Sequence, residues 1–107
     1  MKRILSLIGV VLMVGCGPPD GPFENYYDNG QLQEKGTFVA GELDGPYEFY
    51  YENGQLSEKS NFVAGELDGP FETYDENGQL RAKGTFKDNE QCGEWIEDGE
   101  TVTYDPC

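Results

Sequence analysis

The sequence predicts an all-β protein: an antiparallel β-meander of tandem 24-residue hairpin repeats that forms a single twisted, elongated sheet. Gly-Pro-Phe/Tyr-Glu starts at Gly21, Gly45 and Gly69, and Gly93-Glu94-Trp95 follows at the same interval. Asn-Gly recurs in step, and this dipeptide between apolar residues is a strong hairpin signal. A fixed period of this kind is typical of a supersecondary unit that stacks on its own copies. After residue 20, Gly and Asn interrupt every stretch before a helical period develops.

The first fifteen residues resemble the signal peptide of a bacterial lipoprotein. Lys2-Arg3 is a short positive start, and Ile4 to Val14 is apolar apart from Ser6 and Gly9. That run is about half of the roughly 20 residues that a membrane-spanning helix needs, and it matches a secretory apolar region instead. Leu12-Met13-Val14-Gly15-Cys16 then resembles the lipobox, with Met13 where Leu is usual.

This resemblance implies that residues 1–15 are removed, that Cys16 becomes an acylated first residue, and that 16–21 form a short tether. Acyl chains contribute about 0.8 kcal/mol per buried CH₂ and would anchor the protein to a membrane of the cell envelope. Gly17, rather than Asp, after the cysteine favours the outer over the inner membrane in a Gram-negative cell. The alternative is an ordinary signal peptide with a cysteine nearby.

The repeat domain is expected over residues 22–107, with three full repeats that start near 21, 45 and 69 and a shorter hairpin from 93. A two-residue type I′ turn at Asn53-Gly54 would place Glu52 opposite Gln55 and Tyr51 opposite Leu56. The same register, applied to each repeat, gives three Glu–Lys pairs: Glu24–Lys35, Glu48–Lys59 and Glu72–Lys83. A slip of one residue would break all three, so their coincidence supports the register.

Alternation with a period of two then assigns the two faces of the sheet. The core face is expected to carry Tyr47, Tyr51, Leu56, Ser60 and Phe62 and their equivalents, which include the column Phe23, Tyr47, Phe71 and Trp95. Small residues (Gly36, Ser60 and Gly84) would lie under the aromatic side chain of the partner strand. A second tight turn is expected at Ala40-Gly41, Ala64-Gly65 and Asp88-Asn89, with Leu43 and Leu67 brought beside Phe38 and Phe62.

The three cysteines divide into two roles. If Cys16 carries lipid, Cys92 and Cys107 remain, and an exported protein is in a place that permits a disulfide. Closing a loop of about 15 residues is worth about 3 kcal/mol in the chain-entropy model. The alternatives are two free thiols or a metal pair, although two cysteines without histidine make a poor zinc site.

The charge is strongly acidic. The formal net charge is −14 and becomes −16 if Lys2 and Arg3 leave with the signal peptide. This argues against nucleic acid and against adsorption to anionic lipid headgroups. The acid would keep an extended sheet soluble and discourage pairing between sheet edges. The functional alternative is a basic partner or weak binding of divalent cations.

We expect no enzymatic activity, no cofactor and no metal site. The chain has no histidine, so histidine-based nucleophile relays are excluded, and no phosphate-binding glycine loop precedes a helix. The 21 acidic residues recur at equivalent repeat positions, which is typical of solvated turns rather than of a glycosidase pair. Asp28-Asn29-Gly30 lacks the further ligands of a calcium loop.

Tyr-Tyr-Glu-Asn-Gly-Gln-Leu, at Tyr50–Leu56, with the Gly-Glu-Leu-Asp-Gly-Pro connections, resembles MORN repeats. It is most similar to the bacterial variant often labelled a YwqK-type antitoxin component, and the resemblance covers Gly21 to about Tyr104. It implies the repeat fold and a role as a scaffold, a protein-docking surface or a lipid-contact module. The antitoxin label implies neutralisation of a partner protein.

These features together predict a membrane-anchored envelope lipoprotein that acts as a non-catalytic protein-interaction or scaffold module, with immunity against a toxin as a narrower version. Tyr26, Tyr50 and Tyr74 are the candidate partner-binding residues, roughly 10 Å apart if strands are about 4.8 Å apart. The simpler interpretation is that they only cover the second face. The alternative function is binding of cell-wall or surface glycan through aromatic stacking, and a third is a spacer without a ligand.

Overall fold

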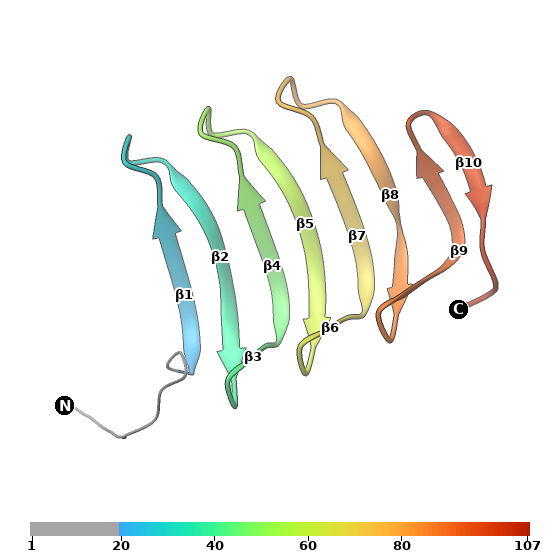
Figure 1. Cartoon of the computed structure of the whole chain (residues 1–107), viewed down its shortest axis with the longest axis horizontal. Helices are drawn as coiled ribbons and strands as arrows, with labels where there is room; N and C mark the ends of the chain where they lie inside the picture. The colour runs from blue at the N-terminus through green and yellow to red at the C-terminus, as the bar shows by residue number, and fades with distance from the viewer. Residues whose placement is uncertain (1–19) are drawn as a thin grey trace.

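The computed structural model describes residues 20–107, which form one open antiparallel sheet with no helix among them (Figure 1). The strands are β1 (Gly21–Tyr26), β2 (Leu32–Val39), β3 (Glu42–Leu43), β4 (Gly45–Tyr50), β5 (Leu56–Val63), β6 (Glu66–Leu67), β7 (Gly69–Tyr74), β8 (Leu80–Lys87), β9 (Glu90–Glu97) and β10 (Glu100–Thr103). Their order across the sheet follows the chain, with β3 paired to β2 and β6 to β5. The predicted all-β meander is confirmed. The predicted signal peptide and Cys16 lie outside the described residues.

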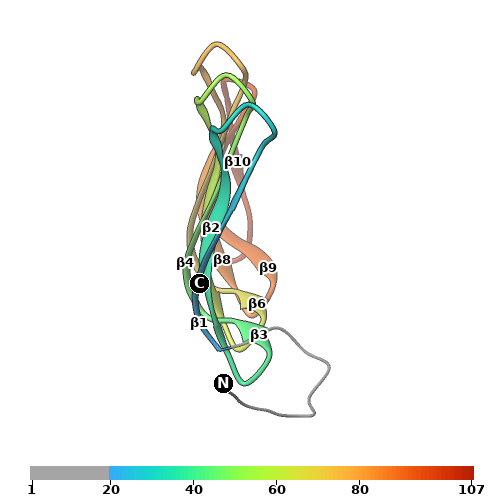
Figure 2. The same cartoon turned by 90° about the vertical axis from the view of Figure 1, so that its left-hand side faces the viewer.

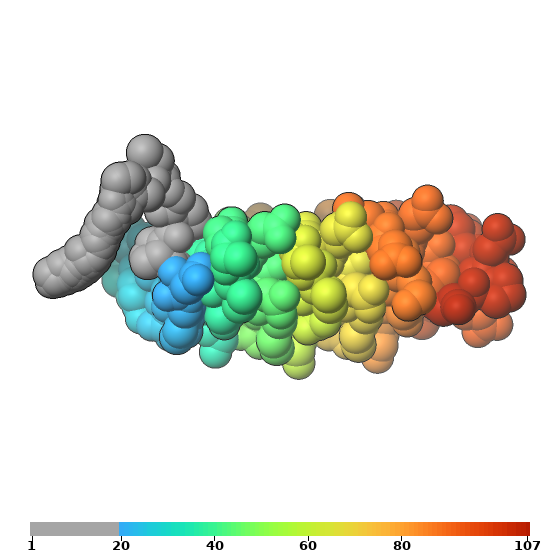
Figure 3. Space-filling view, turned by 90° about the horizontal axis from the view of Figure 1, so that it is seen from below, coloured from blue at the N-terminus to red at the C-terminus, as the bar shows by residue number. Residues whose placement is uncertain are grey.

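The sheet is a single thin layer. Its principal extents are 51 × 35 × 14 Å, and seen edge-on it is gently bowed (Figure 2). The space-filling view from below shows the repeats following one another along a narrow slab (Figure 3). Only Ser60, Cys92 and Trp95 are buried among the described residues. No helix in this part of the chain is long and apolar enough to cross a membrane.

The predicted register is correct in the middle of every hairpin. Glu48 pairs with Lys59 and Tyr47 with Ser60. The equivalent pairs are Glu24–Lys35, Phe23–Gly36, Glu72–Lys83 and Phe71–Gly84. The small residue therefore lies opposite an aromatic residue in each repeat, as predicted.

The predicted type I′ turn at Asn-Gly is wrong. Tyr51 N donates to Gln55 O at 2.9 Å and Gly54 N donates to Tyr51 O at 3.0 Å, so the loop contains three residues. Gly54 has a positive φ of 89°, but Asn53 does not share that conformation. A β-bulge takes up the extra residue, because Tyr50 pairs with Leu56. The predicted pairs Glu52–Gln55 and Tyr51–Leu56 are therefore wrong, although the register beyond the bulge is right.

This correction also moves the leucine column. Leu32, Leu56 and Leu80 pair with Tyr26, Tyr50 and Tyr74. Since cross-strand partners share a face of a sheet, the leucines lie beside the tyrosine column and not, as predicted, in the core. Leu80 is 40 % exposed, in agreement with this placement.

The asparagines of the first two Asn-Gly dipeptides contribute through the hydrogen bonds of their side chains and not through a left-handed backbone conformation. Asn53 Oδ1 accepts a hydrogen bond from Gln55 N at 2.8 Å, and its Nδ2 donates to Glu76 O of the next repeat at 3.0 Å. Asn29 repeats both contacts one unit earlier, with Nδ2 donating to Glu52 O. The side chain therefore closes its own loop and connects neighbouring hairpin tips.

The residue pairs with two positive φ values lie in the second set of turns. Ala40 and Gly41 have φ of 53° and 83°, and Ala64, Gly65, Asp88 and Asn89 repeat the pattern. These are the tight turns predicted at these positions, and their φ signs are those of a type I′ turn. Leu43 pairs with Phe38 and Leu67 with Phe62, as predicted.

Two central strands contain proline, which sheets normally confine to edges or bulges. Pro46 pairs with Asn61 on one side, but the β2–β4 pairing covers only Glu34–Phe49 and Lys35–Glu48. Proline therefore lies where one side of the strand has no ladder partner. The same break recurs at Pro70, because β5–β7 pairing covers only two residue pairs.

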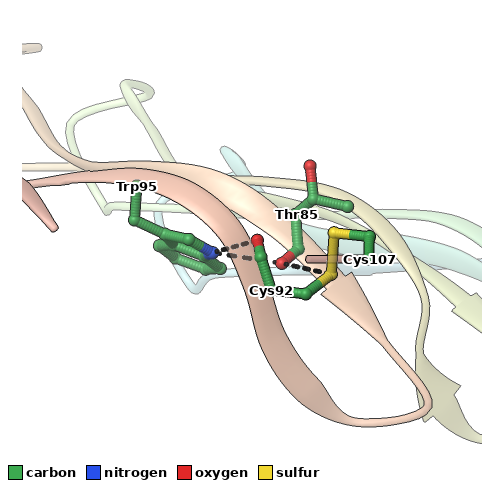
Figure 4. The surroundings of a disulfide bond; sticks show 4 residues. All are labelled: Thr85, Cys92, Trp95 and Cys107. Carbon is green, nitrogen blue, oxygen red and sulfur yellow. Dashed lines mark hydrogen bonds between the residues drawn. A yellow bond between two sulfur atoms is a disulfide. The ribbon is translucent and has the colours of Figure 1, made fainter. Parts of the chain in front are cut away.

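The aromatic core is densest at the C-terminal end. The ring centroids of Trp95 lie 5.8 Å from Phe71, 5.1 Å from Phe86 and 6.2 Å from Tyr104. Trp95 is 2 % exposed, and its Nε1 donates to Thr85 O and Cys92 O, both at 3.1 Å. The Cys92–Cys107 disulfide joins the end of the chain to this cluster (Figure 4). The predicted disulfide is confirmed.

Candidate interaction surface

The three Glu–Lys pairs form one continuous row across the sheet. Lys35 pairs with Glu48 of the next repeat, and Lys59 with Glu72. The row alternates in charge over six strands: Glu24, Lys35, Glu48, Lys59, Glu72 and Lys83. We call the face that carries this row the ladder face, and the face with Trp95 the core face. Sequence reasoning found the pairs within hairpins but not the row, because the pairing between repeats has no local sequence signal.

Ion pairs along this row are exposed and long. Lys35 Nζ lies 3.5 Å from Glu48 Oε1, and Lys83 Nζ lies 3.7 Å from Glu72 Oε2. Exposed pairs of this kind contribute about 0.2–1 kcal/mol each. The row therefore matters more for the order of the surface side chains than for the free energy of unfolding.

The structure places Tyr26, Tyr50 and Tyr74 together on the ladder face, one repeat apart. Each hydroxyl donates to the glutamate two residues earlier on its own strand. The three distances are 2.5 Å for Tyr26–Glu24, 2.5 Å for Tyr50–Glu48 and 2.8 Å for Tyr74–Glu72. Tyr26, on the edge strand, is 57 % exposed, while the other two are half-buried. The result is an array of tyrosine rings held by a repeated contact.

These contacts change the acid–base behaviour of the tyrosines. Burial, together with the hydrogen bond to Glu48, raises the pKa of Tyr50 to about 12. The hydrogen bonds to Glu24 and Glu72 raise the pKa of Tyr26 and Tyr74. In return, the hydrogen bond from Tyr50 lowers the pKa of Glu48. At neutral pH the tyrosines are therefore neutral donors and Glu48 is an ionised acceptor.

The core face contains polar groups that sequence reasoning missed. Tyr47 OH donates to Glu34 Oε1 at 2.6 Å, and Ser60 Oγ donates to Glu58 Oε2 at 3.2 Å. Burial is the main cause of a raised pKa at Tyr47. The recurrence of Glu34 and Glu58 one repeat apart was the available signal. Both carboxylates are satisfied by neighbours, and residues 20–107 contain no cluster of three acidic, Cys or His side chains suited to a metal ion.

The turns at the two rims carry much of the acid. Asp44 Oδ2 accepts from Ala64 N of the next repeat at 3.1 Å, and Asp20 Oδ1 accepts from Gly41 N at 3.3 Å. Exposed acids at the same rim include Glu42, Glu66, Asp88 and Glu90. All 21 acidic residues of the chain fall in the described part, whereas Lys2 and Arg3 do not. The described sheet therefore carries a formal charge of −16, and the ladder face runs between two acidic rims.

A family model decides the relationship of this chain to known proteins. The MORN repeat variant model matches residues 19–40, 43–64 and 67–88, which together exceed half of the sequence. The chain belongs to the MORN repeat variant family. Each matched MORN repeat contains one hairpin of the array, β1–β2, β4–β5 or β7–β8, and β9–β10 follows the third. MORN repeats are generally protein- or membrane-interaction modules and are typically non-catalytic. Searches of curated proteins and of solved structures find no significant match.

Proposed function

We propose that this protein is a lipid-anchored component of the bacterial cell envelope whose MORN repeats form a non-catalytic protein-interaction module. The observation that carries this proposal is the array of Tyr26, Tyr50 and Tyr74 on the ladder face, each held by a hydroxyl–glutamate hydrogen bond. Tyrosine offers a large rigid contact area with a polar tip and is enriched at interaction hot spots. Fixing the ring before binding lowers the entropy cost of association.

The anchor in this proposal is Cys16, at the end of the lipobox-like sequence. Acylation there would leave only a short tether before β1 and keep the sheet near the membrane. The Cys92–Cys107 disulfide supports an oxidising compartment, because such bonds persist mainly in exported proteins. In a Gram-negative cell, Gly17 after the cysteine favours anchoring in the outer membrane over the inner membrane.

Capture of the partner in living cells tests the interaction role. The full chain is crosslinked in its native cell and purified, and bound proteins are identified by mass spectrometry. A variant with Tyr26, Tyr50 and Tyr74 changed to Ser should lose one dominant protein while its thermal stability stays near that of the wild type. The matched control changes Val39 and Val63 to Ser, because these residues are about half exposed on β2 and β5, which pair with the tyrosine-bearing strands β1 and β4, but lie outside the tyrosine array.

Two results would overturn the interaction site. A large loss of thermal stability in the tyrosine variant would show that the rings are structural. Retention of cell-wall material with no specific protein would favour the glycan-binding alternative.

The charge of the sheet supports a narrower form of the proposal, in which the partner is a basic protein such as an incoming toxin. An acidic surface speeds the encounter with a basic partner, and added salt screens that attraction. The association rate should therefore fall markedly as salt is raised. An association rate that does not respond to salt would exclude this mechanism.

A further inference from the structure

The ladder face contains two hollows that repeat one another. The residues that line the first include Pro22, Lys35, Gly36, Thr37, Pro46 and Glu48. The second is lined by Pro46, Lys59, Ser60, Asn61, Pro70 and Glu72. Every residue of the second hollow is the equivalent, 24 residues later, of one that lines the first. Their volumes are about 620 and 280 Å³.

The fold explains why hollows form at these places. The pairing of β2 with β4, and of β5 with β7, covers only two residue pairs each and stops before the prolines. The neighbouring repeats are therefore unpaired beside Pro46 and Pro70, and the short side chain of Thr37 or Asn61 leaves space between two proline rings. Asn61 Nδ2 is held by Asp68 O at 2.8 Å, which fixes one wall.

The hollows are spaced by one repeat, which is two strands, or about 9.6 Å at 4.8 Å per strand. A polyproline II helix advances about 3.1 Å per residue, so residues three apart lie about 9.3 Å apart on one side of it. Such helices recognise grooves through prolines at this spacing and lose little entropy on binding, because they are already extended. The spacing of the two hollows thus matches a Pro-x-x-Pro segment.

Charge indicates what else the segment carries. The six residues of the charge row compensate one another, but the rims on either side of it are acidic, and the described sheet has a formal charge of −16. A segment that crosses the strands along the row passes between these rims. Lysine or arginine at the positions between the prolines would reach toward them, where opposite charge favours association.

We propose that the ladder face binds a basic, proline-rich segment of the partner protein as a polyproline II helix, with two prolines three residues apart in the two hollows. The inference rests on the proposed interaction function and names the chemistry of the partner. The tyrosine array lies beside the hollows, since Glu48 accepts the hydrogen bond from the Tyr50 hydroxyl and also lines the first hollow.

The test measures binding of fluorescein-labelled peptides to the full chain by fluorescence anisotropy. One peptide repeats Pro-Lys-Ala, and the comparator repeats Pro-Lys-Ala-Ala, so that the prolines are no longer three apart. The first should bind at least about tenfold more tightly, a difference of about 1.4 kcal/mol. This comparison needs no variant of the protein.

A pair of variants locates the site. Thr37→Trp should fill the first hollow and weaken binding of the Pro-Lys-Ala peptide by about tenfold or more. The indole would occupy the space that a proline ring needs, and loss of one hot-spot contact has an effect of this size. Val39→Trp is the control, because Val39 lies two residues further along the same strand and face and lines neither hollow. It should leave binding unchanged. Circular dichroism of both variants confirms that they fold alike.

Three results overturn the inference. Equal binding of the two peptides would mean that charge alone attracts them. No binding of either peptide, while the wild-type chain still captures a tyrosine-dependent protein in cells, would exclude the proline-rich segment but leave the proposed function intact. No peptide binding together with retention of purified cell-wall glycan, lost in Thr37→Trp, would exclude both the segment and the protein-interaction role.

Discussion

The first repeat and the C-terminal hairpin close the two ends of the sheet in different ways. At the first, Phe23 stacks on one ring, Phe38, at 4.8 Å, and the edge-strand residue Tyr26 is 57 % exposed. At the other end Trp95 contacts three rings and is 2 % exposed, and a disulfide secures the chain terminus. An array of stacked repeats needs terminal units that protect its ends. The C-terminal hairpin has that role here.

The backbone pairing between successive hairpins is also more extensive at the C-terminal end than between the first two repeats. β8 and β9 are paired at five positions from Ala82–Glu97 to Lys87–Glu90, interrupted by one irregularity between Lys83 and Thr85. β2 and β4 are paired at only two positions, and a hollow lies beside the break. The comparison shows that aromatic packing is densest at the C-terminal end and that the two hollows of the ladder face lie in the earlier repeats.

Truncating the aromatic residue in equivalent positions of the two ends should give the largest difference. Trp95→Ala should lower the free energy of unfolding by about 3–5 kcal/mol, as expected for a fully buried large side chain. Phe23→Ala, with one ring partner, should cost less than about 2 kcal/mol. Urea unfolding followed by circular dichroism compares them, because Trp95 is the single tryptophan and its fluorescence is lost in the variant. Equal costs would remove the contrast between the two ends.

Removal of the disulfide should destabilise the C-terminal hairpin more than the first repeat. Cys107→Ser opens a link between residues 15 apart in sequence, and the expected loss is about 3 kcal/mol in the chain-entropy model. Hydrogen exchange should accelerate in β9 and β10 more than in β1 and β2. Uniform acceleration across the sheet would mean that the array unfolds as one unit and has no separate C-terminal cap.

The small residues opposite the aromatic column offer a milder comparison. A Cβ at Gly84 would overlap the indole of Trp95, whereas a Cβ at Gly36 would lie 3.0 Å from Tyr47 Cδ1 and 3.1 Å from Phe23 Cε1. Serine already occupies the equivalent position 60, buried at 3 % exposure. Gly84→Ser should cost about 1–3 kcal/mol through overpacking and Gly36→Ser less than about 1 kcal/mol. Thermal denaturation of both variants tests this, and a larger cost at Gly36 would contradict it.

Alkaline pH should produce the smallest loss of folding stability, through ionisation of Tyr50 in the second repeat. The folded pKa of Tyr50, about 12, lies above its ordinary value of 10.0. The folded state therefore favours the neutral hydroxyl, and its contribution is complete below pH 10 and is lost as pH rises from about 10 to about 12. Because Tyr50 is only half-buried and solvent screens its contact with Glu48, this contribution is under about 1 kcal/mol.

Thermal melting across this pH range, with Tyr50→Phe as the control, measures the contribution. The variant should lose less stability than the wild type. An identical decline in both proteins would show that the Tyr50–Glu48 contact adds nothing to the fold.

Sequence reasoning succeeded where one signal was repeated. Three independent Glu–Lys pairs determined the register, and the count of cysteines determined the disulfide partners. It failed at Asn53, because the second bond of this asparagine goes to Glu76 O, in a repeat that the local sequence does not specify. The tight turn was predicted, but not that Ala40 would adopt a positive φ of 53°, a conformation that alanine normally avoids.

The candidate surface was predicted only in part for the same reason. Alternation within a strand indicated that Tyr26, Tyr50 and Tyr74 share one face. The charge row and the hollows depend on how β2 meets β4 and β5 meets β7, and no pattern within a repeat encodes that pairing. Those contacts between repeats became available only with the structure.

Site-specific photocrosslinking in cells tests the central claim, that the ladder face is the interaction surface, most directly. A photoreactive amino acid is placed at Tyr50 on the ladder face or at Leu67, which pairs with Phe62 beside the core face. We predict a crosslink to one protein from position 50 and none from position 67. A crosslink from position 67 alone, or from neither position, would contradict the claim.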